Sequence, residues 1–521
     1  MSRNEPPSQK LASVSFASAS SLVLLQLGSR LFTFVLNQIL VRLVSPQVFG
    51  TAAIQFELLL STILFLSREG IRNALLRASP SNGTEPGKSR NPSPLISNIA
   101  LLPILLGIPI TVLSAFTYLY TSSYTTTSQP HFRLAVTIYA LAAFCELLSE
   151  PLYIRAQNEL RFDVRVRAEG AAVAFKTVTA FLVLVLSPPE WALVAFALGQ
   201  AAYGLITLVE FLRVYGRDSE FWLRKVTIDV HGNKVTQYFD PTMLHLSAAM
   251  TIQSVVKHFL TEGDKFLVSR LSPLADQGGY AVASNYGSLI ARIVFQPIEE
   301  TSRIFFSKTL SSSSTNAQED LQTASNTLSV LLLLFTHLFL LLITFAPPYL
   351  PLALTLVLPS RYLQTSAPAI LRTYVYYIPT MAFNGVLEAF FASTATPADL
   401  RAQSRWMLAC SVGFVGASVG FARVLGLGDA GLVWANILNL WLRASYAWFF
   451  VKRFFESRGV GKMVQLRNNV PPFGVLCTFA ASAIVTRWSG RTFGDAPLTL
   501  HAQFGHVAIG VTSVAACLVA W

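Results

Sequence analysis

Residues 328–345 read LSVLLLLFTHLFLLLITF, a stretch without a single charged side chain. Such a run is long enough to cross most of the hydrocarbon core of a bilayer as a helix, and it is too long for a buried strand. The rest of the chain is similar, since 53% of its 521 residues are hydrophobic and only 13% are charged. Backbone groups in lipid must be hydrogen-bonded internally, so the sequence predicts an all-α polytopic membrane protein and excludes a string of soluble domains.

Apolar stretches of similar length recur along the whole sequence. They predict about 14 transmembrane helices, arranged as two six-helix lobes related by a pseudo-two-fold axis, with two further C-terminal helices. The predicted domains are an N-lobe over 1–225, a C-lobe over 226–460 and the C-terminal helices over 461–521. The predicted spans are 13–44, 49–65, 95–120, 134–154, 168–186, 191–212, 241–269, 280–306, 328–345, 369–391, 406–424, 431–451, 472–486 and 502–521.

Two segments of the sequence resemble each other. ILVRLVSPQVFGTAA at 39–53 is similar to FLVSRLSPLADQGGYAVA at 266–283, and each marks the exit of the first helix in a predicted group of six. Six is an even number, so two such copies would share one orientation and be related by an axis normal to the membrane. Chance similarity between two apolar helix ends is the alternative interpretation.

Most of the 39 Lys and Arg residues lie in the N-terminal tail and in the even-numbered connections between the predicted spans. Basic loops stay on the cytosolic side of a membrane, so this asymmetry predicts that both termini are cytosolic. It also accounts for the net charge of +12 without nucleic-acid binding. The sequon Asn82-Gly83-Thr84 then faces the cytosol, and we expect it to stay unmodified.

Some motifs of soluble enzymes occur here in the wrong context. Gly426-x-Gly428-x-x-Gly431 lies in a short connection between spans and predicts a tight turn rather than a dinucleotide site. Gly416-x-Ser418-x-Gly420 lies inside an apolar helix, where its two glycines predict a small-residue packing face. The four cysteines stand singly, without nearby histidines at ligand spacing. We therefore expect no metal site, no cofactor and no enzyme.

Charged side chains inside the predicted spans are the candidates for function. A central Arg or Asp in a transmembrane helix costs about 2.5–3.5 kcal/mol, so such a residue usually faces a partner or a hydrated cavity. Polar residues follow one face of the first and eighth predicted helices, and the seventh helix carries the densest group. The candidate cavity residues are Arg30, Asn37, Arg42, Glu57, Lys257, His258, Glu262, Asp264, Lys265, Arg292, Glu299, Arg303 and Glu388.

These charges allow two interpretations. They can pair with each other, as the three-residue spacing of Glu262 and Lys265 permits, and serve only structure. Polar faces on several helices instead favour a shared hydrated cavity of net positive charge, in which guanidinium groups bind a diphosphate. Arg68 and Arg72 share one face at the cytosolic end of the second span, and we expect them at the cytosolic entrance of that cavity.

The chain resembles the Rft family of endoplasmic-reticulum proteins, which are required for translocation of the dolichol-linked oligosaccharide used in N-glycosylation. The resemblance rests on RLFTFVLNQILVRLVS, LFLSREGIRNALLR, VKHFLTEGDKFLVSRLS, NYGSLIARIVFQPIEETSRIFFSK and IPTMAFNGVLEAFFAS, which lie in both halves of the chain. It implies a fold like that of the multidrug/oligosaccharidyl-lipid/polysaccharide exporters and a place in the endoplasmic-reticulum membrane. It also implies a flippase that moves pentamannosyl-chitobiosyl-diphosphodolichol from the cytosolic to the luminal leaflet.

The resulting hypothesis is alternating access by a monomer whose partners are the lipid-linked oligosaccharide (diphosphodolichol) and membrane lipids. Two alternatives stay open at the level of sequence. A non-transporting accessory protein would bind or present the same lipid through the same cations. An ion-coupled antiporter of the same fold would need fewer cations and more carboxylates facing its cavity.

Overall fold

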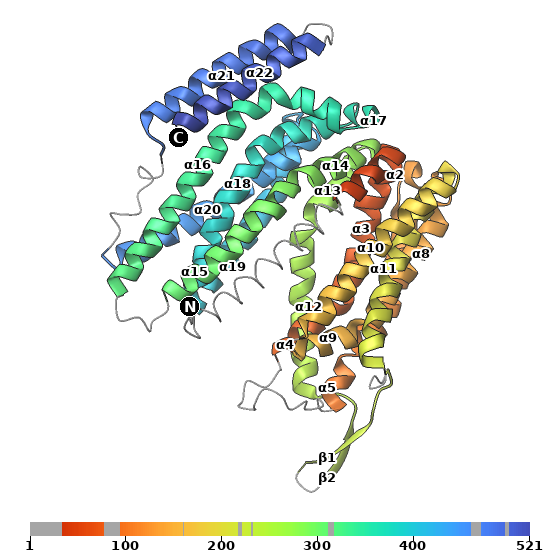
Figure 1. The fold of residues 1–521 in the computed structure, drawn as a ribbon. Helices are drawn as coiled ribbons and strands as arrows, with labels where there is room; N and C mark the ends of the chain where they lie inside the picture. The colour runs from red at the N-terminus through yellow and green to blue at the C-terminus, as the bar shows by residue number, and fades with distance from the viewer. Residues whose placement is uncertain are drawn as a thin grey trace, which may run out of the picture. The chain divides into compact units, whose positions relative to one another are not determined.

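The computed structural model describes residues 34–77, 94–159, 161–216, 221–230, 233–310, 317–459, 470–494 and 500–520. The chain forms two compact units, a first unit over Met1–Gly278 and a second unit over Gly279–Trp521 (Figure 1). Seven helices in the described part are long and apolar enough to cross a membrane, so the chain is a multi-pass helical membrane protein. The count of 14 spans and the lobe boundary at 225 stay predictions.

The first unit begins with a helix over Phe34–Leu43 and a continuous helix that follows it. Ser45 starts the second helix by accepting a hydrogen bond from the Val48 N–H, and Pro46 suits a first turn that needs no donor. The predicted span over 49–65 is too short, because charged residues end the apolar run but not the helix. The helix comprises α2 (Pro46–Gly50), the π-helical turn η1 (Thr51–Phe56), α3 (Glu57–Leu64), the π-helical turn η2 (Phe65–Glu69) and α4 (Gly70–Arg77).

Close packing of α11 against α8 and α10 organises the rest of this unit. An added Cβ at Gly199 would lie 2.8 Å from the Lys176 carbonyl oxygen, and one at Gly204 would lie 2.8 Å from that of Ala142. Only glycine allows such backbone approach, which is how membrane helices commonly pack. The elements are α5 (Pro94–Ile99), α6 (Leu102–Thr121), α7 (Tyr124–Thr127), α8 (Phe132–Leu148), α9 (Glu150–Asn158), α10 (Phe162–Leu186), η3 (Pro189–Trp191) and α11 (Ala192–Tyr215).

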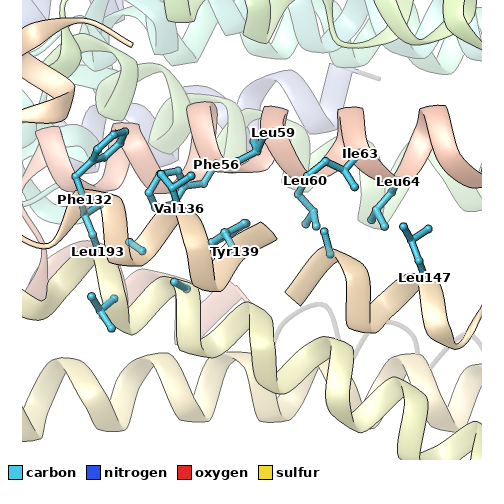
Figure 2. Packing of buried hydrophobic residues seen from close by; sticks show 14 residues of the cluster. Phe56, Leu59, Leu60, Ile63, Leu64, Phe132, Val136, Tyr139, Leu147 and Leu193 are labelled. Atoms are coloured by element: carbon cyan, nitrogen blue, oxygen red, sulfur yellow. The ribbon is translucent and has the colours of Figure 1, made fainter. Parts of the chain in front are cut away.

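An apolar core lies between η1–α3, α8 and α11 (Figure 2). Phe56, Leu60 and Ile63 are buried on one face of the continuous helix, at the spacing of an amphipathic helix. They pack against α8, where the ring of Tyr139 lies 5.0 Å from that of Phe56. This face explains why the helix keeps its position although its other side carries polar residues.

A β-hairpin joins α11 to α12 and extends beyond the helix ends (Figure 1). Its strands β1 (Val226–Val230) and β2 (Asn233–Gln237) are antiparallel, with Val226 opposite Gln237. We predicted only a polar interval here. The signal was present, since VTIDV and NKVTQ alternate in polarity and are separated in the sequence by only two residues, His231 and Gly232.

The seventh predicted span, over 241–269, is wrong as a single helix. The structure divides it into α12 (Pro241–Thr261) and α13 (Gly263–Leu271), because the Glu262 backbone leaves the helical conformation between them. Packing groups both helices with the first unit, where an added Cβ at Gly70 of α4 would lie 2.4 Å from Thr251 Cα of α12.

The two segments that resemble each other in sequence lie against each other. At Gly50 an added Cβ would lie 2.6 Å from the carbonyl oxygen of Leu274, in the first turn of α14 (Leu274–Ile290). At Gly278 an added Cβ would lie 2.0 Å from the Pro46 carbonyl oxygen. Neither position has room for any residue larger than glycine, so α2 and α14 cross in backbone contact.

The second unit is built around α18, which packs against α15, α16 and α20. The apolar run over 328–345 forms the middle of α16, whose polar first turns extend the helix well beyond the predicted span. The elements after α14 are η5 (Ala291–Phe295), α15 (Gln296–Thr309), α16 (Ala317–Val357), α17 (Ser360–Leu363), α18 (Ala367–Thr394), α19 (Pro397–Val419), η6 (Gly420–Val424), α20 (Asp429–Glu456), α21 (Phe473–Gly494) and α22 (Leu500–Ala520).

The last two helices, α21 and α22, lie side by side along α16 (Figure 1). A buried polar contact fixes them there. The His506 ring stacks on Tyr349 of α16 with centroids 4.2 Å apart, and its Nδ1 lies 2.8 Å from Ser489 Oγ of α21. Because His506 of α22 contacts both α16 and α21, it holds α21 and α22 against α16.

The glycine motifs give one confirmed and one wrong prediction. Gly426 and Gly428 have φ of 67° and 55°, so the predicted tight turn before α20 is confirmed and requires glycine. The predicted packing face of Gly416 and Gly420 is wrong within the described part of the chain, since an added Cβ at either would meet nothing within 4 Å. The close approach is instead made by Gly431, against the backbone of Phe421 and Ala422.

Candidate functional site

A network of ion pairs connects the continuous helix of the first unit with α8 and α9. Arg68 and Arg72 are four residues apart on one face, and Glu146 and Glu150 have the same spacing opposite them. Arg68 Nη1 lies 2.9 Å from Glu146 Oε1 and 3.6 Å from Glu150 Oε2. Arg72 donates to both oxygens of Glu150, at 2.5 and 2.6 Å. We call these four residues the Arg68–Glu150 network.

Burial makes the Arg68–Glu150 network strong. The Glu150 side chain is 1% exposed and that of Glu146 is 8% exposed, so water cannot take the place of the arginines. Arg72 also lies over the Tyr153 ring, with Cζ 3.9 Å from the ring centroid, and Arg165 approaches the same ring at 5.2 Å. Removing one partner would leave an uncompensated buried charge, at a cost of about 3–5 kcal/mol.

Arg68 and Arg72 were predicted to bind substrate at the cytosolic entrance. The structure places both in the Arg68–Glu150 network, so an incoming phosphate would have to compete with two carboxylates. Neither Glu146 nor Glu150 was among the predicted site residues. The signal that could have found them is their four-residue spacing at the end of an apolar span, which matches that of the two arginines.

A second polar group surrounds the break between α12 and α13. His258, which is buried, lies with Nε2 3.0 Å from Thr62 Oγ1 of α3, and its ring lies 5.0 Å from that of Phe65. At the break, Lys265 Nζ pairs with Glu262 Oε2 at 2.8 Å, which confirms the pairing that the sequence allowed. Interrupted membrane helices often line substrate or ion sites, because their free backbone groups and polar residues need a hydrated or bound partner.

A third polar group lies beside η1, where Gln55, Tyr118 and Gln277 form a chain of hydrogen bonds. The Tyr118 hydroxyl donates to Gln55 Oε1 at 2.8 Å, and Gln55 Nε2 donates to Gln277 Oε1 at 2.8 Å. The chain joins the continuous helix to α6 and α14 next to the Gly50–Gly278 crossing. Sequence analysis missed it, because single glutamines in apolar segments have no characteristic spacing.

The second unit holds its own ion pairs. Arg443 of α20 donates to both oxygens of Glu388 of α18, at 2.8–3.0 Å, and Arg303 pairs with Glu299 on α15 at 2.9 Å. An added Cβ at Gly385 would lie 3.1 Å from Glu299 Oε2, so the Arg303–Glu299 pair of α15 contacts α18 about one turn before Glu388. Arg443 was not among the predicted site residues. Its position as a lone Arg in the apolar span 431–451 could have identified it as a candidate.

Arg292 has an exposed side chain, and it makes hydrogen bonds to residues one and two turns earlier in the same helix. It lies in the π-helical turn η5, and its Nη2 donates to Asn285 Oδ1 at 3.1 Å and to the Asn285 carbonyl oxygen at 3.4 Å. Its Nε donates to the Ser288 carbonyl oxygen at 3.4 Å. The guanidinium group thus remains reachable for an anion.

The remaining predicted residues lie in different parts of the chain, and some lie outside the described residues. Arg30 and the Lys257 side chain lie outside the described part of the chain. Asn37 and Arg42 lie on the helix Phe34–Leu43, where Arg42 is exposed, and Glu57 opens α3 directly after η1. Asp264 Oδ1 accepts a hydrogen bond from the Lys265 N–H at the start of α13. Within the described residues no three His, Cys, Asp or Glu side chains gather as a metal site would require.

Solved structures define the class of protein to which this fold belongs. The chain is similar to the lipid II flippase MurJ in an inward closed conformation, with a TM-score of 0.59 and 14% identity over 95% of this chain and 98% of that one. It is also similar to an inward-facing multidrug resistance MATE family transporter of the MOP superfamily, with a TM-score of 0.54 and 14% identity over 84% and 99% of the chains. The protein therefore has the fold of a multi-helix exporter.

The sequence narrows this class to one family. Residues 14–521 match the family model described as Rft protein, and the chain belongs to that family. It is 34% identical to the Man(5)GlcNAc(2)-PP-dolichol translocation protein RFT1 of Yarrowia lipolytica, over 87% of this chain and 72% of that protein. The protein of that name from Saccharomyces cerevisiae is 32% identical over 86% and 84%. The one from Xenopus tropicalis is 30% identical over 90% and 87%.

Proposed function

We propose that this protein translocates Man(5)GlcNAc(2)-PP-dolichol from the cytosolic to the luminal leaflet of the endoplasmic-reticulum membrane. The observation that carries the proposal is the identity of 30–34% with translocation proteins for this lipid, over 84–90% of the chain, on a fold shared with a lipid flippase. The lipid bears a diphosphate and seven sugars, and none of these groups can enter hydrocarbon without losing its hydrogen bonds to water.

The cations in the two units supply the chemistry for such a headgroup. A guanidinium group can donate two parallel hydrogen bonds to one phosphate, so arginine suits a diphosphate better than lysine does. Arg292 is the first contact in this proposal, because its side chain is exposed to an incoming anion.

The strength of each ion pair then decides how readily its arginine can leave its carboxylate and contact the diphosphate. The buried partners of Arg68 and Arg72 hold these arginines until a stronger or additional anion arrives, so the two residues serve as exchangeable partners and not as an open entrance. The pairs Arg303–Glu299 and Arg443–Glu388 are more exposed and exchange more readily. Each such pair can give a polar headgroup hydrogen bonds in place of those that it loses to water.

Alternating access requires helices that can bend. Under this proposal the interrupted helices at η1 and at Glu262 bend, and both interruptions lie in the first unit together with the crossing of Gly50 and Gly278.

Complementation of glycosylation tests the proposal. The chain is expressed in Saccharomyces cerevisiae cells depleted of their own relative, and the N-glycan occupancy of a secreted glycoprotein is measured by gel mobility. We expect the wild-type chain to restore occupancy. Persistent under-glycosylation, with the protein present in the membrane at the level of the yeast relative, would contradict the proposal.

A second function, that of an accessory protein that binds and presents the lipid, is favoured by one observation. Arg68 and Arg72 are already neutralised by buried carboxylates, as they would be in a protein that does not pass a diphosphate along its interior. Purified protein would then bind the lipid without moving it between leaflets, whereas an ion-coupled antiporter of the same fold would bind no lipid-linked oligosaccharide.

A further inference from the structure

The chain between α11 and the β-hairpin carries an exposed aromatic and basic sequence. Phe221-Trp222-Leu223 are followed by Arg224 and Lys225. Trp222 is 83% exposed, and its two apolar neighbours are exposed as well. Three consecutive exposed apolar side chains are unusual on a surface that faces water, so this segment needs a partner.

Asn98 fixes the depth of this segment. Its Nδ2 donates to the Arg224 carbonyl oxygen at 2.7 Å and to the Tyr238 carbonyl oxygen at 2.5 Å, and its Oδ1 accepts from the Arg224 N–H at 3.0 Å. Asn98 itself is buried and lies in α5, near the start of the apolar helical span Ser97–Thr121 that α5 and α6 form together. That helix is about 37 Å long, slightly more than the hydrocarbon core, so its first residues lie at the level of the lipid headgroups.

The segments that enter and leave the hairpin therefore lie side by side at the level of the lipid headgroups. The Lys225 ammonium lies 5.7 Å from the Tyr238 ring centroid, so a basic and an aromatic residue from opposite legs stand together. Trp and Tyr concentrate at this depth because their rings are apolar and their N–H or O–H groups are polar. Lys and Arg near the surface are attracted to anionic lipids.

We propose that Phe221, Trp222, Leu223, Arg224, Lys225 and Tyr238 form a membrane anchor that binds the headgroup layer of anionic phospholipids. Trp222 lies between headgroups and acyl chains, while Arg224 and Lys225 contact lipid phosphates. Asn98 holds the segments before β1 and after β2 at this depth through Arg224 and Tyr238. It thereby fixes the ends of α11 and α12 relative to the membrane. By the predicted topology, the anchor lies in the cytosolic leaflet.

A lipid partner fits this surface better than a soluble protein does. The segment 221–226 contains no acidic residue, so it complements lipid phosphates along its whole length. Its position beside the first turn of a membrane-spanning helix leaves a soluble partner little room to approach its apolar side chains without meeting the headgroups. The anchor does not depend on the proposed function, since any substrate would leave it unchanged.

Fluorescence quenching in nanodiscs tests the anchor. A Trp222→Cys variant, in a background without the four native cysteines, is labelled with bimane and reconstituted in phosphatidylcholine with or without phosphatidylserine. Thr236→Cys, an exposed position further along β2, is the matched label. Monodisperse elution and restored glycosylation check that each labelled protein is folded.

We expect the label at position 222 to lose quenching by aqueous iodide and to gain quenching by headgroup nitroxide lipids, more strongly with phosphatidylserine. The variant Arg224→Gln/Lys225→Gln should remove the phosphatidylserine dependence, whereas the label at 236 should stay open to iodide. Equal iodide quenching at 222 and 236 would overturn the proposal and leave the surface for a soluble partner. Shielding that ignores phosphatidylserine would overturn it as well.

Discussion

At the scale of single residues, burial decides what each charge can do. Glu150, Glu146 and His258 are buried, so their partners are fixed by packing, whereas Arg292 stays exposed. The sequence predicts that charges in apolar spans need partners, and the pairing of Glu262 with Lys265 is confirmed. It could not predict partners that lie 78 positions apart, as in the Arg68–Glu150 network, because no local spacing encodes such a contact.

Neutralising Arg72 should strongly destabilise the protein. Arg72→Gln leaves the Glu150 carboxylate buried without its bidentate donor, and we expect a loss of about 3–5 kcal/mol in the free energy of unfolding. Lys452→Gln is the matched control, because its pair with Glu456 is exposed and contributes about 0–1 kcal/mol. Denaturant titration in detergent measures both. Similar midpoints for the two variants would contradict the assigned role of the Arg68–Glu150 network.

Neutralising Arg292 should affect function and not stability. Its side chain is exposed, and substitutions at exposed positions change stability little, so Arg292→Gln should unfold like the wild-type protein. Glycosylation in complemented cells should nevertheless fall, with partial recovery for Arg292→Lys, which keeps the charge and loses the bidentate geometry. Arg401→Gln, at an exposed position on α19, is the control. Full activity of Arg292→Gln would remove this residue from the site.

At the scale of helices, the termini and interruptions were harder to predict than the helices themselves. Apolar length indicated helices in both units, but the predicted span over 241–269 runs through the break at Glu262, because no local spacing marks where a polar stretch interrupts a helix. The close contact at Gly278 is also invisible in composition, because a glycine required by a neighbouring backbone looks like any other glycine. Gly416 and Gly420 were misread for the same reason.

The crossing of α2 and α14 should tolerate no side chain. Gly278→Ala would place Cβ within 2.0 Å of the Pro46 carbonyl oxygen, so we expect a clear loss of thermal stability and of glycosylation in complemented cells. Gly413→Ala is the control, since its Cβ would meet nothing within 4 Å, and replacing a helical glycine should stabilise slightly. A fully stable and active Gly278→Ala variant would refute the close crossing.

At the scale of the whole molecule, topology links the charge asymmetry to the direction of transport. We expect both termini on the cytosolic side of the endoplasmic-reticulum membrane, because Lys and Arg gather in the connections on that side. In sealed microsomes, proteases added outside should therefore remove a C-terminal epitope tag, and a luminal chaperone in the same vesicles should stay protected. A protected tag would invert the predicted orientation or change the number of spans.

Leaflet exchange in sealed vesicles tests the central claim, that basic side chains in this protein carry a diphosphate headgroup across the membrane. Purified protein is reconstituted with labelled Man(5)GlcNAc(2)-PP-dolichol, and the lipid reachable from outside is followed over time with a membrane-impermeant reagent. We predict exchange well above that of empty vesicles, and much slower exchange for folded Arg292→Gln. Exchange no faster than in empty vesicles, with lipid binding retained, would contradict transport and leave the accessory role.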